Sequence, residues 1–199
     1  MKKTTLLIIA GILASSPALA AEPQVYVSPE IGIISHSSDW CSSCDTTSFG
    51  FGISGGINIT DNLGIEVGYL RTSRNLESVS DLPVPNVGPV SGSLDETLST
   101  FKVGGKVRID VSDEVNLVGR LGFHKWDLEW DIDVTGNGGS AISGSVDVID
   151  GMNPYFGGGI QLQASDNIHI EAAITRYVLD EELFDESATA FSAALLFEL

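Results

Sequence analysis

The fold is decided by residues 49–59, which read Phe49-Gly50-Phe51-Gly52-Ile53-Ser54-Gly55-Gly56-Ile57-Asn58-Ile59. Large apolar residues occupy nearly every odd position, and glycine or a small polar residue occupies the even ones. A repeat of two places successive side chains on opposite faces of an extended chain. The segment is therefore predicted to be a β-strand with one apolar face and one polar, glycine-rich face.

The same alternation recurs seven more times and accounts for most of the chain. We expect eight strands, which include residues 25–33, 49–59, 63–69, 101–109, 115–123, 156–162, 168–174 and 191–199. Each is close to the roughly 9 to 11 residues of a tilted membrane-spanning strand. In no later part of the chain is there the run of about 18 apolar residues that a membrane helix needs.

The expected connections between these strands are unequal in length. Three are tight turns around Asp61, Asp113 and Asp166. The other four are expected to be long loops, approximately at residues 37–48, 73–97, 127–151 and 179–189. Short turns at one end and long loops at the other are typical of outer-membrane barrels, whose short turns face the periplasm. An even number of strands then places both termini in the periplasm.

Alternation alone does not decide which face points inward, because a soluble barrel of the lipocalin type also alternates. The polar face does decide, since glycine is too frequent on it for a water-exposed strand surface, and a narrow lumen needs small residues beside long ones. Charges on this face balance as well, with four acids and four bases: Glu30, Glu66, Glu171, Glu198, Lys102, Lys106, Arg108 and Arg120. Buried charges are tolerated when they are paired, so these eight are predicted to form a charge network that fills the lumen.

The predicted fold class is therefore all-β, an eight-stranded antiparallel up-and-down transmembrane β-barrel. Four aromatic residues, Tyr69, Trp126, Trp130 and Tyr177, fall near the loop ends of the strands. They are expected either to form part of an aromatic girdle at the membrane interface or to pack within the loops.

The N-terminus carries an export signal. Lys2 and Lys3 precede an apolar run at residues 6–13, and Ala18-Leu19-Ala20 supplies small residues for cleavage. This pattern predicts a signal peptide at residues 1–20 and one barrel domain at residues 21–199, because the apolar run is too short for an uncleaved membrane anchor. Cleavage takes the formal net charge from −17 to −19 by removing two lysines, which argues against nucleic acid as a partner.

The two cysteines, Cys41 and Cys44, lie three positions apart in a Ser-rich segment. In an exported protein this spacing predicts a short disulfide. A thioredoxin-like redox pair would begin a helix, and a zinc site needs two more ligands, so both are disfavoured.

No catalytic constellation is recognised, and the chain is expected not to be an enzyme. A His-Ser pair serves some outer-membrane lipid A deacylases, but His36-Ser37 closes the first strand with no carboxylate nearby to orient the histidine. His124 and His169 are expected inside the lumen as hydrogen-bonded residues. No cofactor or dedicated metal site is predicted.

Acidic residues concentrate in two of the expected loops. They are Asp127, Glu129, Asp131 and Asp133, followed by Asp180, Glu181, Glu182, Asp185 and Glu186. Carboxylates can bind hard cations weakly, which could bridge to lipopolysaccharide phosphates, but the EF-hand spacing is absent. A solvated acidic rim is the favoured interpretation.

The chain resembles the OmpA-like and OmpX-like family of eight-stranded outer-membrane barrels over residues 25–199. The resemblance is carried by the Gly-rich second strand, by Asn153-Pro154-Tyr155-Phe156-Gly157-Gly158-Gly159, and by the C-terminal Phe197-Glu198-Leu199, which is similar to the signal that the barrel assembly machinery recognises. It implies a Gram-negative outer-membrane location, contact with outer-membrane lipid and lipopolysaccharide, and a barrel without a peptidoglycan-binding domain.

The function expected from these observations is that of a structural, adhesin-like surface barrel. Its lumen is plugged by side chains, and its acidic extracellular loops contact a surface or host partner. The alternative is a low-conductance, porin-like channel. A soluble periplasmic ligand binder is a third class, which extraction without detergent would reveal.

Overall fold

The computed structural model describes residues 23–37, 47–84, 88–136, 141–181 and 184–199. The expected signal peptide at residues 1–20, the two cysteines and Glu182 lie outside this part. Within the described residues there is no helix long and apolar enough to cross a membrane.

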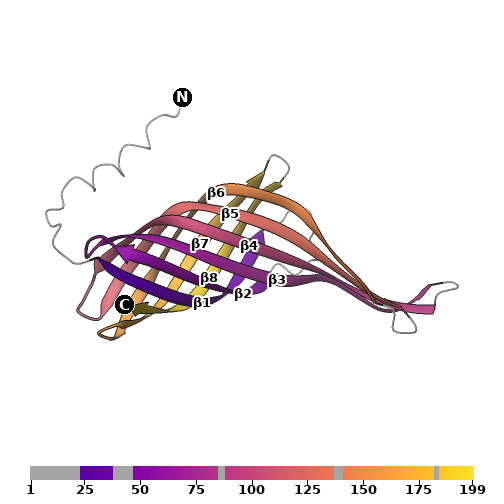
Figure 1. Ribbon diagram of the computed structural model, residues 1–199, viewed down its shortest axis with the longest axis horizontal. Helices are drawn as coiled ribbons and strands as arrows, with labels where there is room; N and C mark the ends of the chain where they lie inside the picture. The colour runs from indigo at the N-terminus through magenta and orange to yellow at the C-terminus, as the bar shows by residue number, and fades with distance from the viewer. Residues whose placement is uncertain (1–22, 38–46, 85–87, 137–140, 182–183) are drawn as a thin grey trace, which may run out of the picture.

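Eight antiparallel strands form one closed barrel, as the sequence predicted (Figure 1). Each strand pairs with the next in the sequence, and β1 pairs with β8 to close the ring. The strands are β1 (Gln24–Ser37), β2 (Thr47–Asn58), β3 (Leu63–Val84), β4 (Gly88–Asp110), β5 (Val115–Gly136), β6 (Ala141–Ser165), β7 (Ile168–Glu181) and β8 (Phe184–Glu198).

The three tight turns lie at the end of the barrel where β1 begins and β8 ends. At the turn before β3, the backbone N–H groups of Ile59 and Thr60 donate to the carbonyl oxygen of Leu63, and the Thr60 hydroxyl accepts from the N–H of Asn62. Since outer-membrane barrels keep their short turns in the periplasm, this is the periplasmic end.

Two of the expected long loops are strands. Residues 73–97 and 127–151 lie almost wholly in paired strands, and β3 to β6 continue well past the ends of their neighbours as a narrowing four-stranded sheet (Figure 1). The last expected loop, 179–189, is also largely strand, with Leu179 opposite Glu186. The prediction of loops was wrong here, because the residues outside the membrane remain hydrogen-bonded to neighbouring strands.

The apolar face points outward and the polar face inward. Phe51, Ile65 and Phe123 are all more than half exposed on the outside of the barrel, whereas Glu66 and Lys102 are almost fully buried inside. An exposed belt of large apolar side chains around a barrel is stable in contact with lipid and not with water. The predicted orientation of the two faces is therefore confirmed.

The polarity of the two faces reverses where β5 leaves this belt, although the side chains continue to alternate between the faces. Trp126 and Leu128 point inward into an apolar core, while Asp127 and Glu129 point outward. The strand does not slip in register across β4, so the reversal reflects a change of surroundings from lipid to water. Trp126 and Tyr177, only 2% and 3% exposed, are interior residues and not part of an interface girdle.

Candidate functional sites: the lumen and the outer sheet

Arg120 is the centre of the charges inside the barrel. Its guanidinium lies 3.1 Å from Glu66 Oε1 and 2.6 Å from Glu171 Oε1, so it bridges β3 and β7 across the lumen. The Tyr26 hydroxyl donates to Glu66 Oε2 at 2.9 Å. Lys106 approaches Glu171 at 3.7 Å and lies over the Tyr26 ring, 4.5 Å from its centre. Five strands thus contribute to one ion-pair cluster.

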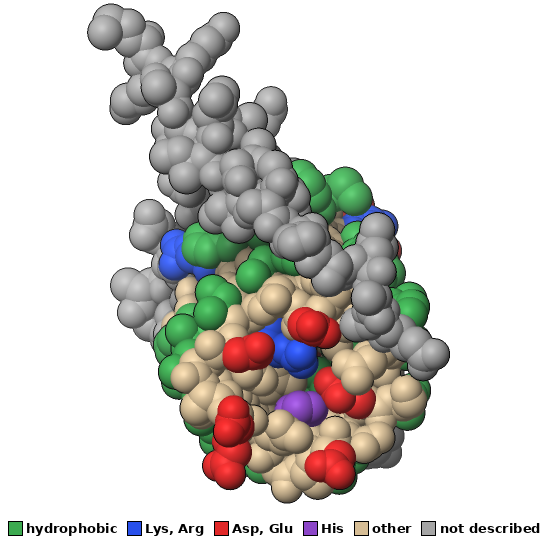
Figure 2. Space-filling model, turned by 90° about the vertical axis from the view of Figure 1, so that its left-hand side faces the viewer, with side chains coloured by type: hydrophobic (Ala, Val, Ile, Leu, Met, Phe, Trp, Pro, Cys, Tyr) green, Lys and Arg blue, Asp and Glu red, His purple; other side chains and the backbone are tan. Residues whose placement is uncertain are grey.

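Two smaller ion-pair groups flank this cluster. On its extracellular side Lys102 Nζ donates to Glu30 Oε1 at 3.0 Å. On its periplasmic side Arg108 and His169 approach Glu198 at 3.9 and 3.3 Å. The structure places every member of the predicted lumen set in an ion pair: Glu30, Glu66, Lys102, Lys106, Arg108, Arg120, Glu171 and Glu198. Figure 2, a view onto the periplasmic end, shows basic and histidine side chains at the centre of the mouth with acidic ones around it.

Inward glycines make room for the long inward side chains. The Tyr155 ring passes over Gly122, where an added Cβ would lie 2.7 Å from the ring. The Trp126 indole passes in the same way over Gly151, where a Cβ would lie 2.8 Å from it. Without these glycines the lumen of an eight-stranded barrel could not hold side chains of this size.

An apolar layer fills the lumen on the extracellular side of the charges. Its core consists of Ile34, Leu70, Leu98, Trp126, Tyr155, Tyr177, Leu179, Ala188 and Ala190. The rings of Tyr155 and Tyr177 stack with centres 5.9 Å apart, and the His124 ring meets Tyr177 edge-on at 5.1 Å. This layer separates the charge network from a further buried ion pair on its extracellular side, Arg74 with Glu96 at 2.6 Å, which corrects the expectation of a polar plug throughout.

His124 lies at the boundary between the two layers, where it faces the lumen as expected. Its Nε2 lies 2.9 Å from the carbonyl oxygen of Val178 and donates to it. Trp126 Nε1 donates to Asn153 Oδ1 at 2.9 Å, so the largest buried ring also has its one donor satisfied.

Above the membrane, the outward face of β4, β5 and β6 is strongly acidic. Carboxylates stand directly opposite one another in three cross-strand pairs, Asp95 with Asp131, Asp127 with Asp150, and Glu129 with Asp147. Like charges directly opposite each other destabilise a sheet. Lys125 offsets one pair, 3.6 Å from Asp127 and 3.8 Å from Asp150. Facing acids of this kind lower the stability of the sheet and attract cations.

The extended sheet also has an open edge on β6. The pairing of β6 with β7 begins at Tyr155, so the described strands provide only β5 as a neighbour for residues 141–152. The edge carries exposed apolar side chains, with Ile142 75% and Met152 73% exposed. An edge strand presents free backbone donors and acceptors that can pair with another extended chain.

The described acidic side chains of β5 are not gathered into a metal site. Asp127, Glu129, Asp131 and Asp133 alternate along β5, so their Cα atoms are about 7 Å apart. Within the described ranges no group of three His, Cys, Asp or Glu residues is arranged to hold a metal ion. Asp180, Glu181, Asp185 and Glu186 lie on β7 and β8, but their side chains, like the two cysteines, are outside the described part.

A closed barrel with an apolar outer belt and a charged, packed interior defines the class of integral outer-membrane proteins of Gram-negative bacteria. The chain belongs to the outer membrane protein beta-barrel domain family, whose model matches residues 5–197. A comparison with curated protein sequences finds no match.

Among solved structures, the chain is similar to Neisserial surface protein A, with a TM-score of 0.59 and 16% identity over 90% of this chain and 100% of that one. It is also similar to Ail, the attachment invasion locus protein of Yersinia pestis, solved with the heparin analogue sucrose octasulfate. That match has a TM-score of 0.57 and 17% identity over 90% and 100% of the two chains. OprG of Pseudomonas aeruginosa matches at 0.53 and 8% identity, covering 88% of this chain and 95% of OprG.

Proposed function

We propose that the protein is a non-enzymatic surface barrel that binds a cationic, extended protein segment on its outer sheet. The observation that carries the proposal is the sheet of β3 to β6, which leaves the membrane with an acidic face and an open β6 edge. A segment with alternating basic side chains would add to that edge as a further strand and place its charges beside the facing carboxylates.

The acidity of this face distinguishes the protein from Ail, which was solved in complex with a heparin analogue, sucrose octasulfate. Three cross-strand acid pairs repel a polyanion and attract a polycation. The ligand that we propose for this protein is therefore opposite in charge to the sulfated analogue bound by Ail.

The binding test uses a fluorescent ten-residue peptide of alternating Lys and Val, titrated into the folded barrel in zwitterionic detergent. Replacing Asp147 and Asp150 by Asn is expected to weaken binding about fivefold to tenfold, since each exposed charge contributes up to about 1 kcal/mol. A barrel in which residues 130–146 are replaced by an Asn-Gly turn, which joins the facing Glu129 and Asp147 directly, should also bind more weakly than the wild type, because it lacks Asp131, Asp133 and the β6 edge at residues 141–146.

The matched control removes the same charge from the other end of the molecule, with Asp113 and Asp166 both replaced by Asn. This variant should bind the peptide as the wild type does. Equal weakening by both pairs of substitutions would contradict a binding face on the outer sheet, as would equal affinity for a Glu/Val peptide.

Conductance in planar bilayers distinguishes this function from the channel alternative. We expect the wild type to carry no steady current, because ion pairs and an apolar layer occupy the lumen in series. Stable, ion-selective openings that change on replacing Lys102 or Glu66 by Ala would overturn the proposal in favour of a channel.

A further inference from the structure

A groove runs across the lipid-facing surface of β7 and β8. Its volume is about 620 Å³, and three small residues, Gly158, Ala172 and Ala193, form its floor. Ala172 stands directly opposite Ala193, with large residues on both sides. The walls are Ile31, Ile33, Ile160, Ile174 and Phe191. Two adjacent alanines thus leave a hollow in a belt that elsewhere carries long apolar side chains.

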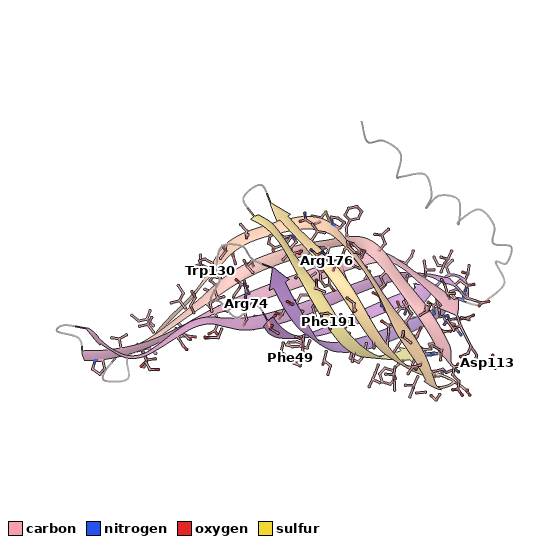
Figure 3. All side chains as sticks on the ribbon, turned by 180° about the vertical axis from the view of Figure 1, so that it is seen from behind. Phe49, Arg74, Asp113, Trp130, Arg176 and Phe191 are labelled. Atoms are coloured by element: carbon pink, nitrogen blue, oxygen red, sulfur yellow. The ribbon has the colours of Figure 1, made fainter. Side chains whose placement is uncertain are left out.

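Arg176 lies at the extracellular end of this groove. It is the next outward residue after Ile174 on β7, about 7 Å further along the strand. Its Nη2 donates to Ser187 Oγ at 2.7 Å and its Nη1 to Thr189 Oγ1 at 3.5 Å, both on β8. Figure 3 shows Arg176 and Phe191 on these two strands. The guanidinium is therefore held over the strand pair that forms the groove floor.

The Arg176 guanidinium is held by hydroxyl groups of the neighbouring strand. Within the described part of the chain, its hydrogen-bond partners are two hydroxyl groups and no carboxylate. Lys125, on the outer face of β5, differs because it lies near the carboxylates of Asp127 and Asp150. A guanidinium that the described side chains hold only through hydroxyl groups, next to an apolar hollow, matches a ligand with a phosphate at one end and a hydrocarbon chain at the other.

We propose that this groove and Arg176 bind one phosphorylated lipid of the outer leaflet, the lipid A part of lipopolysaccharide. An acyl chain lies over Ala172 and Ala193, and a phosphate accepts hydrogen bonds from the Arg176 guanidinium. The groove opens on the side of the barrel, whereas the peptide-binding face is on the outer sheet, so the two proposals are independent. We infer this lipid because the Arg176 guanidinium lies at the level of the outer-leaflet headgroups.

The test measures lipid retained by the folded full-length barrel in native mass spectrometry, with bis-phosphorylated lipid A and its dephosphorylated form as probes. The wild type is expected to retain one phosphorylated molecule. Arg176→Gln should weaken binding of the phosphorylated form about fivefold and leave the dephosphorylated form unchanged, as expected for one interfacial charge. Ala172→Leu with Ala193→Leu should weaken binding of both forms about tenfold or more by filling the groove.

Two matched controls address the remaining explanations. Arg71→Gln removes a cation next to the extracellular edge of the belt on β3, and Gly105→Leu adds one leucine side chain to the outer face of β4, across the barrel from β8. Both should retain lipid A as the wild type does. Equal loss in Arg71→Gln and Arg176→Gln would overturn the site. So would unchanged binding in the double leucine variant, or a barrel dimer that this variant alone disrupts, which would assign the groove to a second copy.

Discussion

Replacing Arg120 by Met is expected to lower the free energy of unfolding by about 3–5 kcal/mol, because it leaves Glu66 and Glu171 buried without their shared partner. The two carboxylate side chains are 2% and 4% exposed, and Lys106 alone remains near Glu171, at 3.7 Å. Urea unfolding in lipid vesicles, followed by tryptophan fluorescence, measures the loss.

Two further variants show whether the burial of the charges causes this loss of stability. Arg108→Met removes an ion pair at the periplasmic mouth, where the side chain is 21% exposed and 3.9 Å from Glu198, and should cost under about 1 kcal/mol. Adding Glu66→Gln to Arg120→Met should recover much of the stability, because Glu171 then keeps Lys106 as its partner and no buried charge is left uncompensated. If Arg120→Met and Arg108→Met lower the free energy of unfolding equally, the burial of the central cluster does not determine the loss of stability.

Replacing Gly122 by Val should prevent the barrel from closing. A Cβ there would lie 2.5 Å from the Gly104 Cα and 2.7 Å from the Tyr155 ring. The first of these contacts is with the backbone of a paired strand, which cannot move without breaking the ladder between β4 and β5. Overpacking of this kind costs about 3 kcal/mol or more. The measurement is heat-modifiable migration in gels, in which a closed barrel runs differently before and after boiling.

Gly119→Val is the matched control, on the same strand three residues earlier. A Cβ at Gly119 meets nothing within 4 Å, since this glycine faces outward. This variant should keep the shifted band and unfold within about 0.5 kcal/mol of the wild type. A normal shift in Gly122→Val would show that the lumen is looser than the described packing.

The sequence predicted the barrel and the face of each strand, because alternation is a local property of the chain. Glu30 and Lys102 were assigned to the lumen in this way. Their pairing could not be predicted, since the two residues are 72 positions apart and their meeting depends on strand register and barrel stagger. Alternation gives the face on which a residue lies, but not its height in the lumen.

The same pattern also carries a signal for the two interior aromatic residues. Trp126 has the inward parity of Arg120 and His124, and Tyr177 has that of Glu171, so parity alone placed both aromatics inside. Their nearness to the expected loops favours a girdle or loop packing instead, and that expectation is wrong for both. The change at Asp127 from apolar outside to acidic outside marked the surface of the membrane, and the strand itself continues to Gly136.

The cluster around Arg120 has a consequence for the order of assembly. Its partners come from β1, β3, β4, β5 and β7, so no single hairpin can neutralise its own charges. A hairpin inserted alone would carry unpaired carboxylates or cations into hydrocarbon. We therefore expect these side chains to stay hydrated until β1 pairs with β8. Water would then leave the interior in a single late step. The pairing of β1 with β8 would also determine the rate at which the barrel unfolds.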